Sequence, residues 1–239
     1  MEYYYHPELF TDHIKLSPEE SKHLKVLHRK KGDEILISDG KGTIAKAMIM
    51  SIEKEGVFLS VMERKTEKQA RNFTLHIAIA PTKNRDRIEW FVEKAVEIGI
   101  EQITLIICEH SERQRMEITR LEKIAISAMK QSQTAWLPKI RCCSFIEFIQ
   151  HFSGSGDKFI AWCGSQTMPV QLFQVPIYSQ NVTILIGPEG DFSSQEVELA
   201  KKHHFIEVLL GNKRLRTETA GLYACAVITA RNENREFIQ

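Results

Sequence analysis

The spacing of hydrophobic residues divides the chain into a first part of short strands and a longer second part of alternating strands and helices. In the first part, residues 33–38, 43–51 and 56–62 read as strands, and the Asp-Gly-Lys-Gly sequence at 39–42 is typical of a turn. Ser17 and Pro18 predict the start of a short helix that runs to about Leu27. These elements predict a small barrel-like module.

The second part predicts an α/β domain with a mostly parallel sheet, because strands alternate with helices. Apolar strands are expected at 74–80, 103–108, 158–162, 182–186 and 206–210. Helical spacing covers 85–98, followed by Gly99 as a C-terminal cap, and 117–132. A capping box opens a helix at Ser193, and Thr217 is expected to cap the last helix. The polar stretch 63–72 reads as a linker, which gives domains at 1–68 and 72–239.

Composition narrows the class of protein. The 239 residues are 43% hydrophobic and 26% charged, which excludes a disordered chain or a fibre. No apolar run approaches the roughly 20 residues of a membrane span, and no apolar signal-peptide core follows Met1, so we expect a cytoplasmic protein without membrane association. Five cysteines without Cys-x-x-Cys spacing argue against a disulfide framework and a zinc ribbon, and we expect no metal. The net charge of +1 means that nucleic-acid binding must depend on local clusters.

Two of the predicted strands end in glycine-containing loops that lead into helices. One loop is Gly-Pro-Glu-Gly at 187–190, and the other starts at Gly211 and carries Lys213, Arg214 and Arg216. Ligands of open α/β sheets bind outside the carboxyl ends of strands, and glycine lets backbone approach a ligand closely. We expect the two strands to be neighbours that share a cleft, although an ordinary turn would explain each loop alone. Neither loop has the Gly-x-Gly-x-x-Gly pattern of a dinucleotide site.

Two clusters of cations favour binding of an anion, although a solvated charged surface would also explain them. Lys83, Arg85 and Arg87 stand at a predicted helix start, where they oppose the helix dipole. The run 22–31 holds five Lys or Arg, two His and no acid, which is typical of a nucleic-acid patch. The aromatic residues at 3–5 and Phe10 could stack on bases or fill the core behind an edge strand.

At these segments the sequence resembles the RsmE-type 16S ribosomal RNA uridine N3-methyltransferases of the SPOUT superfamily. The resemblance covers nearly the whole chain, in the expected order. It is carried by residues 84–90 and 93–99, by 186–193 with its Gly-Pro-Glu-Gly, by Leu-Arg-Thr-Glu-Thr-Ala-Gly at 215–221, and by 23–28 with 32–35 near the start. It implies an N-terminal PUA-like RNA-binding β-barrel and a SPOUT-type parallel sheet with a C-terminal trefoil knot. It also implies S-adenosylmethionine as methyl donor, 16S rRNA or the small ribosomal subunit as partner, and a homodimer.

The resemblance also implies the residues of the donor site, through loops matching 185–190, 210–212 and 215–220. They are Leu185, Ile186, Gly187, Pro188, Glu189, Gly190, Leu210, Gly211, Asn212, Leu215, Arg216, Thr217, Thr219 and Ala220. For RNA we expect contacts from the two cation clusters, namely Lys22, Lys25, Arg29, Lys30, Lys83, Arg85 and Arg87. Two departures from the family pattern stand out: Lys130 and Thr134 replace Glu and Arg, and Lys213-Arg214-Leu215 differs from the usual Arg-Ile-Leu.

Methyl transfer to uridine N3 requires alignment and removal of the N3 proton, because the donor methyl is already electrophilic. A cationic surround of Arg216, Lys213 and Arg87 would favour the uridinate anion. Arg216 is the first catalytic candidate, and either Glu189 or Glu218 could accept the proton. Two alternatives stay open: a SPOUT methyltransferase with another RNA target, and a non-catalytic RNA-binding protein of ribosome assembly.

The last predicted helix offers one sequence feature that agrees with a homodimer. Its small residues would allow a second helix to approach closely, either from a partner subunit or from the same chain. They are Ala220, Gly221, Ala224, Ala226 and Ala230.

Overall fold

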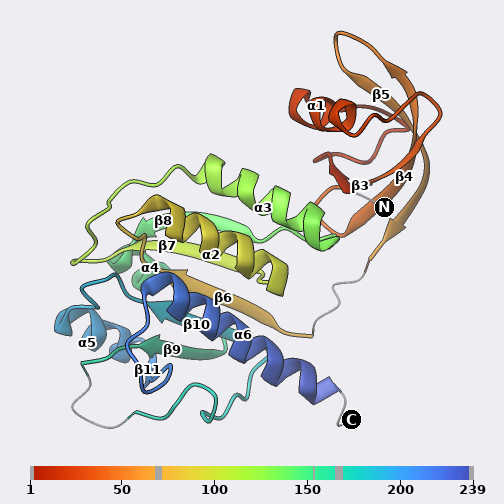
Figure 1. The fold of residues 1–239 in the computed structure, drawn as a ribbon. Helices are drawn as coiled ribbons and strands as arrows, with labels where there is room; N and C mark the ends of the chain where they lie inside the picture. Colours follow the sequence, from red (N-terminus) through yellow and green to blue (C-terminus); the bar gives the residue numbers. More distant parts are fainter. Residues whose placement is uncertain (1–2, 68–71, 153, 165–168, 237–239) are drawn as a thin grey trace. The chain divides into compact units, whose positions relative to one another are not determined.

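The computed structural model describes residues 3–67, 72–152, 154–164 and 169–236, which form two compact units (Figure 1). The first unit comprises Met1–Ala70 together with Ile126–Leu137, and the second comprises Arg71–Ala125 together with Pro138–Gln239. Among the helices described, none is both long and apolar enough to cross a membrane.

The first unit is built on a five-stranded sheet in the order β1-β3-β4-β5-β2. All neighbouring strands are antiparallel except β1 and β3, which are parallel. The three strands predicted from the sequence and the helix capped by Ser17 are confirmed, whereas β1 and β2, of three residues each, carry too short a pattern to predict. The elements are β1 (Tyr3–Tyr5), β2 (His13–Lys15), α1 (Pro18–Val26), β3 (Glu34–Ser38), β4 (Thr43–Ile52) and β5 (Val57–Thr66).

The aromatic residues at the start of the chain have different surroundings. Tyr4 is fully buried in the core of the first unit, beside Leu24 and Ile37. Base stacking by Tyr4 is therefore wrong, and the alternative of a core contact behind the edge strand β1 is confirmed. Phe10 is 82% exposed, so base stacking by its ring stays a prediction.

The turn at 39–42 is confirmed, and it packs against the end of the segment 126–137. Gly40 and Gly42 have left-handed φ values of 68° and 97°. A Cβ on either would collide with Leu137 or Trp136, so both positions require glycine. Backbone bonds join the two segments, with Gly42 N donating to Ala135 O at 2.9 Å. Residues 126–137 thus belong to the first unit, although no feature of the sequence separates them from the second domain.

Lys130, one of the departures from the family pattern, forms an ion pair within the first unit. Its Nζ lies 2.6 Å from Oε1 of Glu20, and the two side chains are only 17% and 5% exposed. A buried carboxylate without a partner is costly, so a cation is required opposite Glu20. This contact gives Lys130 a structural role that the sequence did not predict.

The predicted linker begins later than expected. Strand β5 continues to Thr66, and its last residues pair with β4 from Thr43 to Lys46. Charged residues at 63–65 are compatible with a strand here because their side chains are exposed. The interpretation of 63–66 as linker is therefore wrong, and 68–71 lie outside the described residues.

The second unit contains a six-stranded sheet in the order β11-β9-β10-β6-β7-β8, and every neighbouring pair is parallel. This confirms the predicted α/β class and parallel sheet. The elements are β6 (Thr74–Ile79), α2 (Arg85–Ile98), β7 (Gln102–Ile107), α3 (Ile118–Ser132, shared with the first unit), β8 (Lys139–Ser144), α4 (Phe145–His151), β9 (Asp157–Ala161), β10 (Asn181–Ile186), α5 (Ser194–Lys202), β11 (Ile206–Val208) and α6 (Thr217–Glu236).

Helices cover both faces of this sheet (Figure 1). On one face, α4 and α5 pack in a core that includes Ala78 and Ala80. On the other, α6 approaches so closely at Gly221 that a Cβ there would lie 2.8 Å from both Ile79 and Phe91. Gly221 therefore packs within its own chain, while Ala226 and Ala230 are exposed.

Candidate functional site

The second unit has a cavity of about 480 Å³ at the carboxyl ends of three adjacent strands. Residues that follow β9, β10 and β11 all line it. The expectation that the two glycine-ended strands share a cleft is confirmed. The expectation that they are neighbours is wrong, because β9 lies between β10 and β11.

Most residues of the predicted donor site line this cavity. Ten do so: Ile186, Gly187, Pro188, Glu189, Leu210, Gly211, Leu215, Arg216, Thr217 and Ala220. Four others do not: Leu185, Gly190, Asn212 and Thr219. Leu185 is fully buried one position before the end of β10, in the core under α4 and α5. Its side chain is thereby directed away from the cavity.

The glycines of these loops differ in what surrounds them. A Cβ on Gly187 would lie 3.1 Å from the Phe192 ring, and one on Gly190 would lie 3.0 Å from His110. These two glycines therefore make room for side chains of the same chain. Gly211 differs, because its φ of +135° favours glycine and a Cβ there would meet nothing within 4 Å. Among these three glycines, only Gly211 has open space where a ligand could approach the backbone.

Two hydrogen bonds hold the predicted donor loops together. The Thr217 hydroxyl donates to the carbonyl of Gly187 at 3.1 Å, and Arg214 Nη2 donates to the carbonyl of Glu189 at 3.2 Å. Thr217 is the first residue of α6, and Arg216 O accepts the first helical bond from Ala220 N. Thr217 is therefore not the helix cap that the sequence predicted. Its buried hydroxyl instead joins α6 to the loop after β10.

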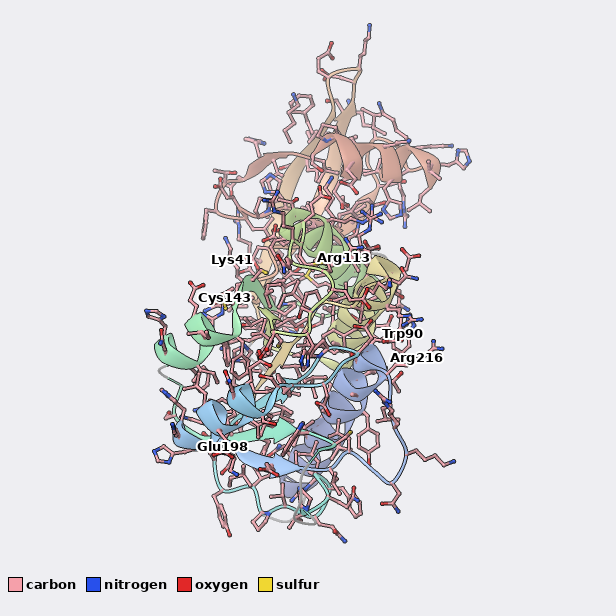
Figure 2. The ribbon with its side chains drawn as sticks, turned by 90° about the vertical axis from the view of Figure 1, so that its left-hand side faces the viewer. Lys41, Trp90, Arg113, Cys143, Glu198 and Arg216 are labelled. Atoms are coloured by element: carbon pink, nitrogen blue, oxygen red, sulfur yellow. The ribbon has the colours of Figure 1, made fainter. Side chains whose placement is uncertain are left out.

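A second cavity, of about 280 Å³, is lined by α2 and by the start of α6. Its lining includes Trp90 within α2, Arg216 directly before α6, and Glu218, and Figure 2 shows the labelled Trp90 and Arg216 close together. Arg87 and Arg216 line both cavities. The exposed side chain of Arg216 therefore reaches the donor cavity and the smaller one.

The two candidate bases have different surroundings. Glu189 is half-buried in the larger cavity, and its Oε1 accepts a hydrogen bond from the backbone N–H of Lys83 at 3.0 Å. Glu218 is only 7% exposed, and its Oε1 lies 3.7 Å from Nε of Arg87. Its Oε2 is buried and has no hydrogen-bond partner in the described part of the chain. Glu218 thus has a buried carboxylate oxygen whose hydrogen-bonding capacity is unused among the described residues.

The cations at the start of α2 are all paired with carboxylates. Lys83 lies 2.7 Å from Glu112, Arg85 lies 3.0 Å from Glu89, and Arg87 pairs with Glu218. The helix itself is capped by Asn84, whose side chain accepts from Asp86 N. The ion pairs explain how three cations are tolerated at a helix N-terminus. Contact between these three cations and RNA stays a prediction.

The basic run 22–31 lies on and after α1 in the first unit. Lys22, Lys25 and Lys30 are exposed and Arg29 is half-buried. Lys25 donates to the carbonyl of Glu53 at 3.1 Å. This surface is accessible, as a phosphate-binding patch requires, but its contact with RNA also stays a prediction.

Sequence reasoning missed the part of the larger cavity that follows β9. Trp162 and Cys163 line this part, and Cys163 N donates a hydrogen bond at 3.1 Å to Oδ2 of Asp191, a lining residue in the loop after β10. Asp191 itself has a left-handed φ of 65°. The apolar strand ending near Trp162 was visible in the sequence, but its position between β10 and β11 was not.

Within the described ranges, no group of three or more His, Cys, Asp or Glu could hold a metal ion.

Comparison with known protein families gives two matches. Residues 69–229 match the family described as RNA methyltransferase domain, and residues 16–62 match the RNA methyltransferase PUA domain. The first match covers more than half of the chain and includes all the loops that line the larger cavity.

Individual relatives agree over nearly the full length. Ribosomal RNA small subunit methyltransferase E of Bacillus subtilis is 27% identical over 231 residues, which are 91% of this chain and 90% of that protein. A probable rRNA-methyltransferase from Porphyromonas gingivalis is 38% identical, with a TM-score of 0.91 over 98% of this chain and 100% of that one. Ribosomal RNA small subunit methyltransferase E from Neisseria gonorrhoeae, bound to S-adenosyl methionine, is 26% identical, with a TM-score of 0.86 over 97% and 98%.

Proposed function

Since this chain belongs to the RNA methyltransferase domain family, we propose that it transfers a methyl group from S-adenosylmethionine to N3 of a uridine in 16S rRNA. The observation that carries the proposal is the larger cavity, where the Gly-Pro-Glu-Gly loop after β10 meets the loop that leads to Arg216. Relatives named ribosomal RNA small subunit methyltransferase E match this chain over most of their length.

The residues around the larger cavity fit the proposed donor. Its volume of about 480 Å³ lies in the range of small-molecule sites. Apolar side chains such as Ile186 and Leu215 can cover an adenosine, and the open backbone at Gly211 permits close approach. The carboxylate of Asp191 supplies negative charge for the cationic part of the molecule. The bound donor would supply an electrophilic methyl group.

The chain's own task is then to orient the base and to stabilise its deprotonated form. Arg216 can do this from the boundary of the two cavities, since a guanidinium favours an anionic ring by electrostatic attraction. Lys213 also lines the larger cavity and adds positive charge. Glu189 and Glu218 remain the candidates for the proton acceptor.

The proposal includes the trefoil knot and the homodimer, which the family resemblance implies, and also a cytoplasmic location. The packing of Gly221 within its own chain removes part of the sequence argument for the dimer. The exposed Ala226 and Ala230 on α6 still allow close approach of a second copy. Sedimentation of the purified protein distinguishes a dimer from a monomer.

The proposal also assigns the basic run 22–31 of the first unit to RNA phosphates. Replacing Lys25, Arg29 and Lys30 by Ala should weaken RNA binding at low salt and lower the slope of log K against log salt by about one unit per lost contact. Donor binding, measured by calorimetry, should not change, because these residues are in the other unit. An unchanged slope would assign the run to a solvated charged surface.

The proposed activity is tested on small ribosomal subunits and on rRNA extracted from them, both from cells that lack this protein. Incubation with S-adenosylmethionine and nucleoside analysis should yield 3-methyluridine. A methylated ribose or another base would favour a different RNA methyltransferase activity. Donor binding without any transfer would favour a non-catalytic role in ribosome assembly.

A further inference from the structure

The smaller cavity is adjacent to the donor cavity and has its own chemical character. Arg87 and Arg216 belong to both, while Trp90, Glu218 and Thr219 line only the smaller one. Its volume of about 280 Å³ suits a fragment such as one nucleobase better than a whole nucleotide cofactor. The donor and a second, smaller reactant could therefore occupy the two cavities side by side.

Glu218 gives the smaller cavity an unsatisfied acceptor. The residue is only 7% exposed, and Oε2 has no hydrogen-bond partner within the described residues. Buried polar atoms nearly always have a partner, so an unpaired acceptor on a residue that lines a cavity indicates a donor supplied by a ligand. Arg87 Nε lies 3.7 Å from the other oxygen, Oε1, and helps to hold the carboxylate in place. The ligand should therefore carry an N–H or O–H group.

The charges around Glu218 specify the ligand further. Two guanidinium groups, those of Arg87 and Arg216, line the same cavity as this carboxylate. A ligand edge that satisfies all three groups carries one N–H donor flanked by two acceptors. Uracil has this edge, with N3–H between the O2 and O4 carbonyls. Cytosine does not, because its N3 is an acceptor and would face the carboxylate with a lone pair.

Trp90 provides a surface for the flat side of such a ring. It is 41% exposed and lines the smaller cavity, so its ring is accessible there. It stands on α2 one helical turn after Arg87, and Figure 2 shows it beside Arg216. Nucleobases that leave their stack are commonly held on aromatic side chains.

We propose that the smaller cavity holds the target uracil, with Trp90 stacked on its face and Glu218 as the base that removes the N3 proton. This inference rests on the proposed function and names its substrate pocket. The N3–H bond breaks and its proton passes to Glu218 Oε2. The N3 electron pair forms the new bond to the methyl carbon, and the carbon–sulfur electrons return to sulfur, so that S-adenosylhomocysteine leaves as a neutral thioether. Arg216 and Arg87 stabilise the negative charge on O2 and O4 of the ring.

The assignment of Glu218 is tested with Glu218→Gln, which keeps the shape of the side chain. Single-turnover methyl transfer to unmethylated small subunits should fall by about 10²- to 10⁴-fold at neutral pH. The residual rate should rise with pH, since hydroxide replaces the missing base. Calorimetry should show unchanged affinity for S-adenosylmethionine. Glu198→Gln, an exposed carboxylate on α5, is the control and should keep the full rate.

The assignment of Trp90 is tested with Trp90→Ala and Trp90→Phe. Loss of one stacking contact should weaken binding of unmethylated small-subunit rRNA by about 5- to 150-fold in the Ala variant. The Phe variant should recover most of this affinity, because the stacking surface remains. Tyr178→Ala removes an aromatic side chain that is 86% exposed elsewhere in the unit and should have no effect. Sedimentation of each variant should match that of the unchanged protein.

The possible failures are distinguishable. If the unchanged protein does not methylate uridine at all, the proposed function fails and this inference falls with it. If the unchanged protein methylates uridine while Glu218→Gln retains its rate, only the assignment of the base is overturned. If Trp90→Ala changes the oligomeric state and leaves RNA affinity unchanged, the cavity is a subunit contact and the uracil pocket is refuted.

Discussion

His76 makes the stability of the second unit depend on pH. It lies in β6 with only 4% of its surface exposed, and its Nε2 is 2.7 Å from the Thr104 hydroxyl oxygen. Arg141 donates to the same hydroxyl oxygen at 2.9 Å. The pKa of His76 is lowered from 6.5 to about 3, mainly by burial and secondly by the charge of Arg141. The imidazole is therefore neutral in the folded protein under ordinary conditions.

The direction of the effect follows from proton binding. Below its normal pKa of 6.5, His76 takes up a proton in the unfolded chain, whereas in the folded protein it does so only below a pKa of about 3. Stability is therefore lost as the pH falls from about 6.5 towards 3. A pH of 5 lies about 1.5 units below the normal pKa of 6.5, and each unit corresponds to about 1.36 kcal/mol. Through this residue alone, the folded state should therefore be about 2 kcal/mol less stable at pH 5 than at pH 7.

Chemical denaturation of the unchanged protein and of His76→Leu, at pH 7 and at pH 5, tests this prediction. The variant has lost the titrating group, so its change in unfolding free energy between the two pH values should be smaller by about 2 kcal/mol. Amide hydrogen exchange in β6 and β7 reports on the second unit separately, which matters because the chain has two units. His151→Gln, an exposed residue on α4, should leave the pH dependence unchanged. Equal pH dependence in the unchanged protein and His76→Leu would refute the reasoning.

Three further substitutions test other parts of the structure. Lys130→Met leaves Glu20 buried without its cation and should lower the free energy of unfolding of the first unit by about 3–5 kcal/mol, whereas replacing both residues by Met should recover most of it in chemical denaturation. Gly211→Ala forces an L side chain into a φ of +135° and should weaken S-adenosylmethionine binding in calorimetry by at least about fivefold. Arg216→Ala should lower methyl incorporation by about 10²- to 10³-fold while leaving donor affinity and the sedimentation coefficient unchanged; near-normal turnover would remove Arg216 from the catalytic residues.

The strong patterns in the sequence predicted most of the elements of the second unit. Helix α2 begins after Asn84 and ends at the left-handed Gly99, and the capping box at Ser193 opens α5 as expected. These signals are local, because a cap is satisfied by residues within one turn of the helix. Strand β8 and helix α4 were not predicted, since β8 is a largely exposed edge strand and α4 has only seven residues.

The contents of the site could be predicted only in part. The loops after β10 and β11 were recognised by their glycines and by the family resemblance, and both line the larger cavity. The order of the strands could not be inferred, so Trp162 and Cys163 after β9 were missed. The close contacts beside Gly187 and Gly190 could not be inferred either, because the side chains of Phe192 and His110 that fill the space beside them come from tertiary packing.

Trp90 illustrates the same limit for the smaller cavity. In the sequence it is one aromatic residue in a helical pattern, and its exposure of 41% becomes visible only in the folded chain. Its proximity to Arg216 and Glu218 depends on the packing of α2 against α6, two helices that are more than a hundred residues apart in the sequence. Contacts of this kind are fixed by the tertiary fold and leave no local pattern in the sequence.

The most direct test of the central claim is nucleoside mass spectrometry of small-subunit rRNA from cells with and without this protein. The account predicts that 3-methyluridine is present in 16S rRNA when the protein is present, is lost when it is removed, and returns when the purified protein and S-adenosylmethionine are added to the unmethylated subunits or their rRNA. An unchanged content of 3-methyluridine, or the loss of a different methylated nucleoside, would contradict it.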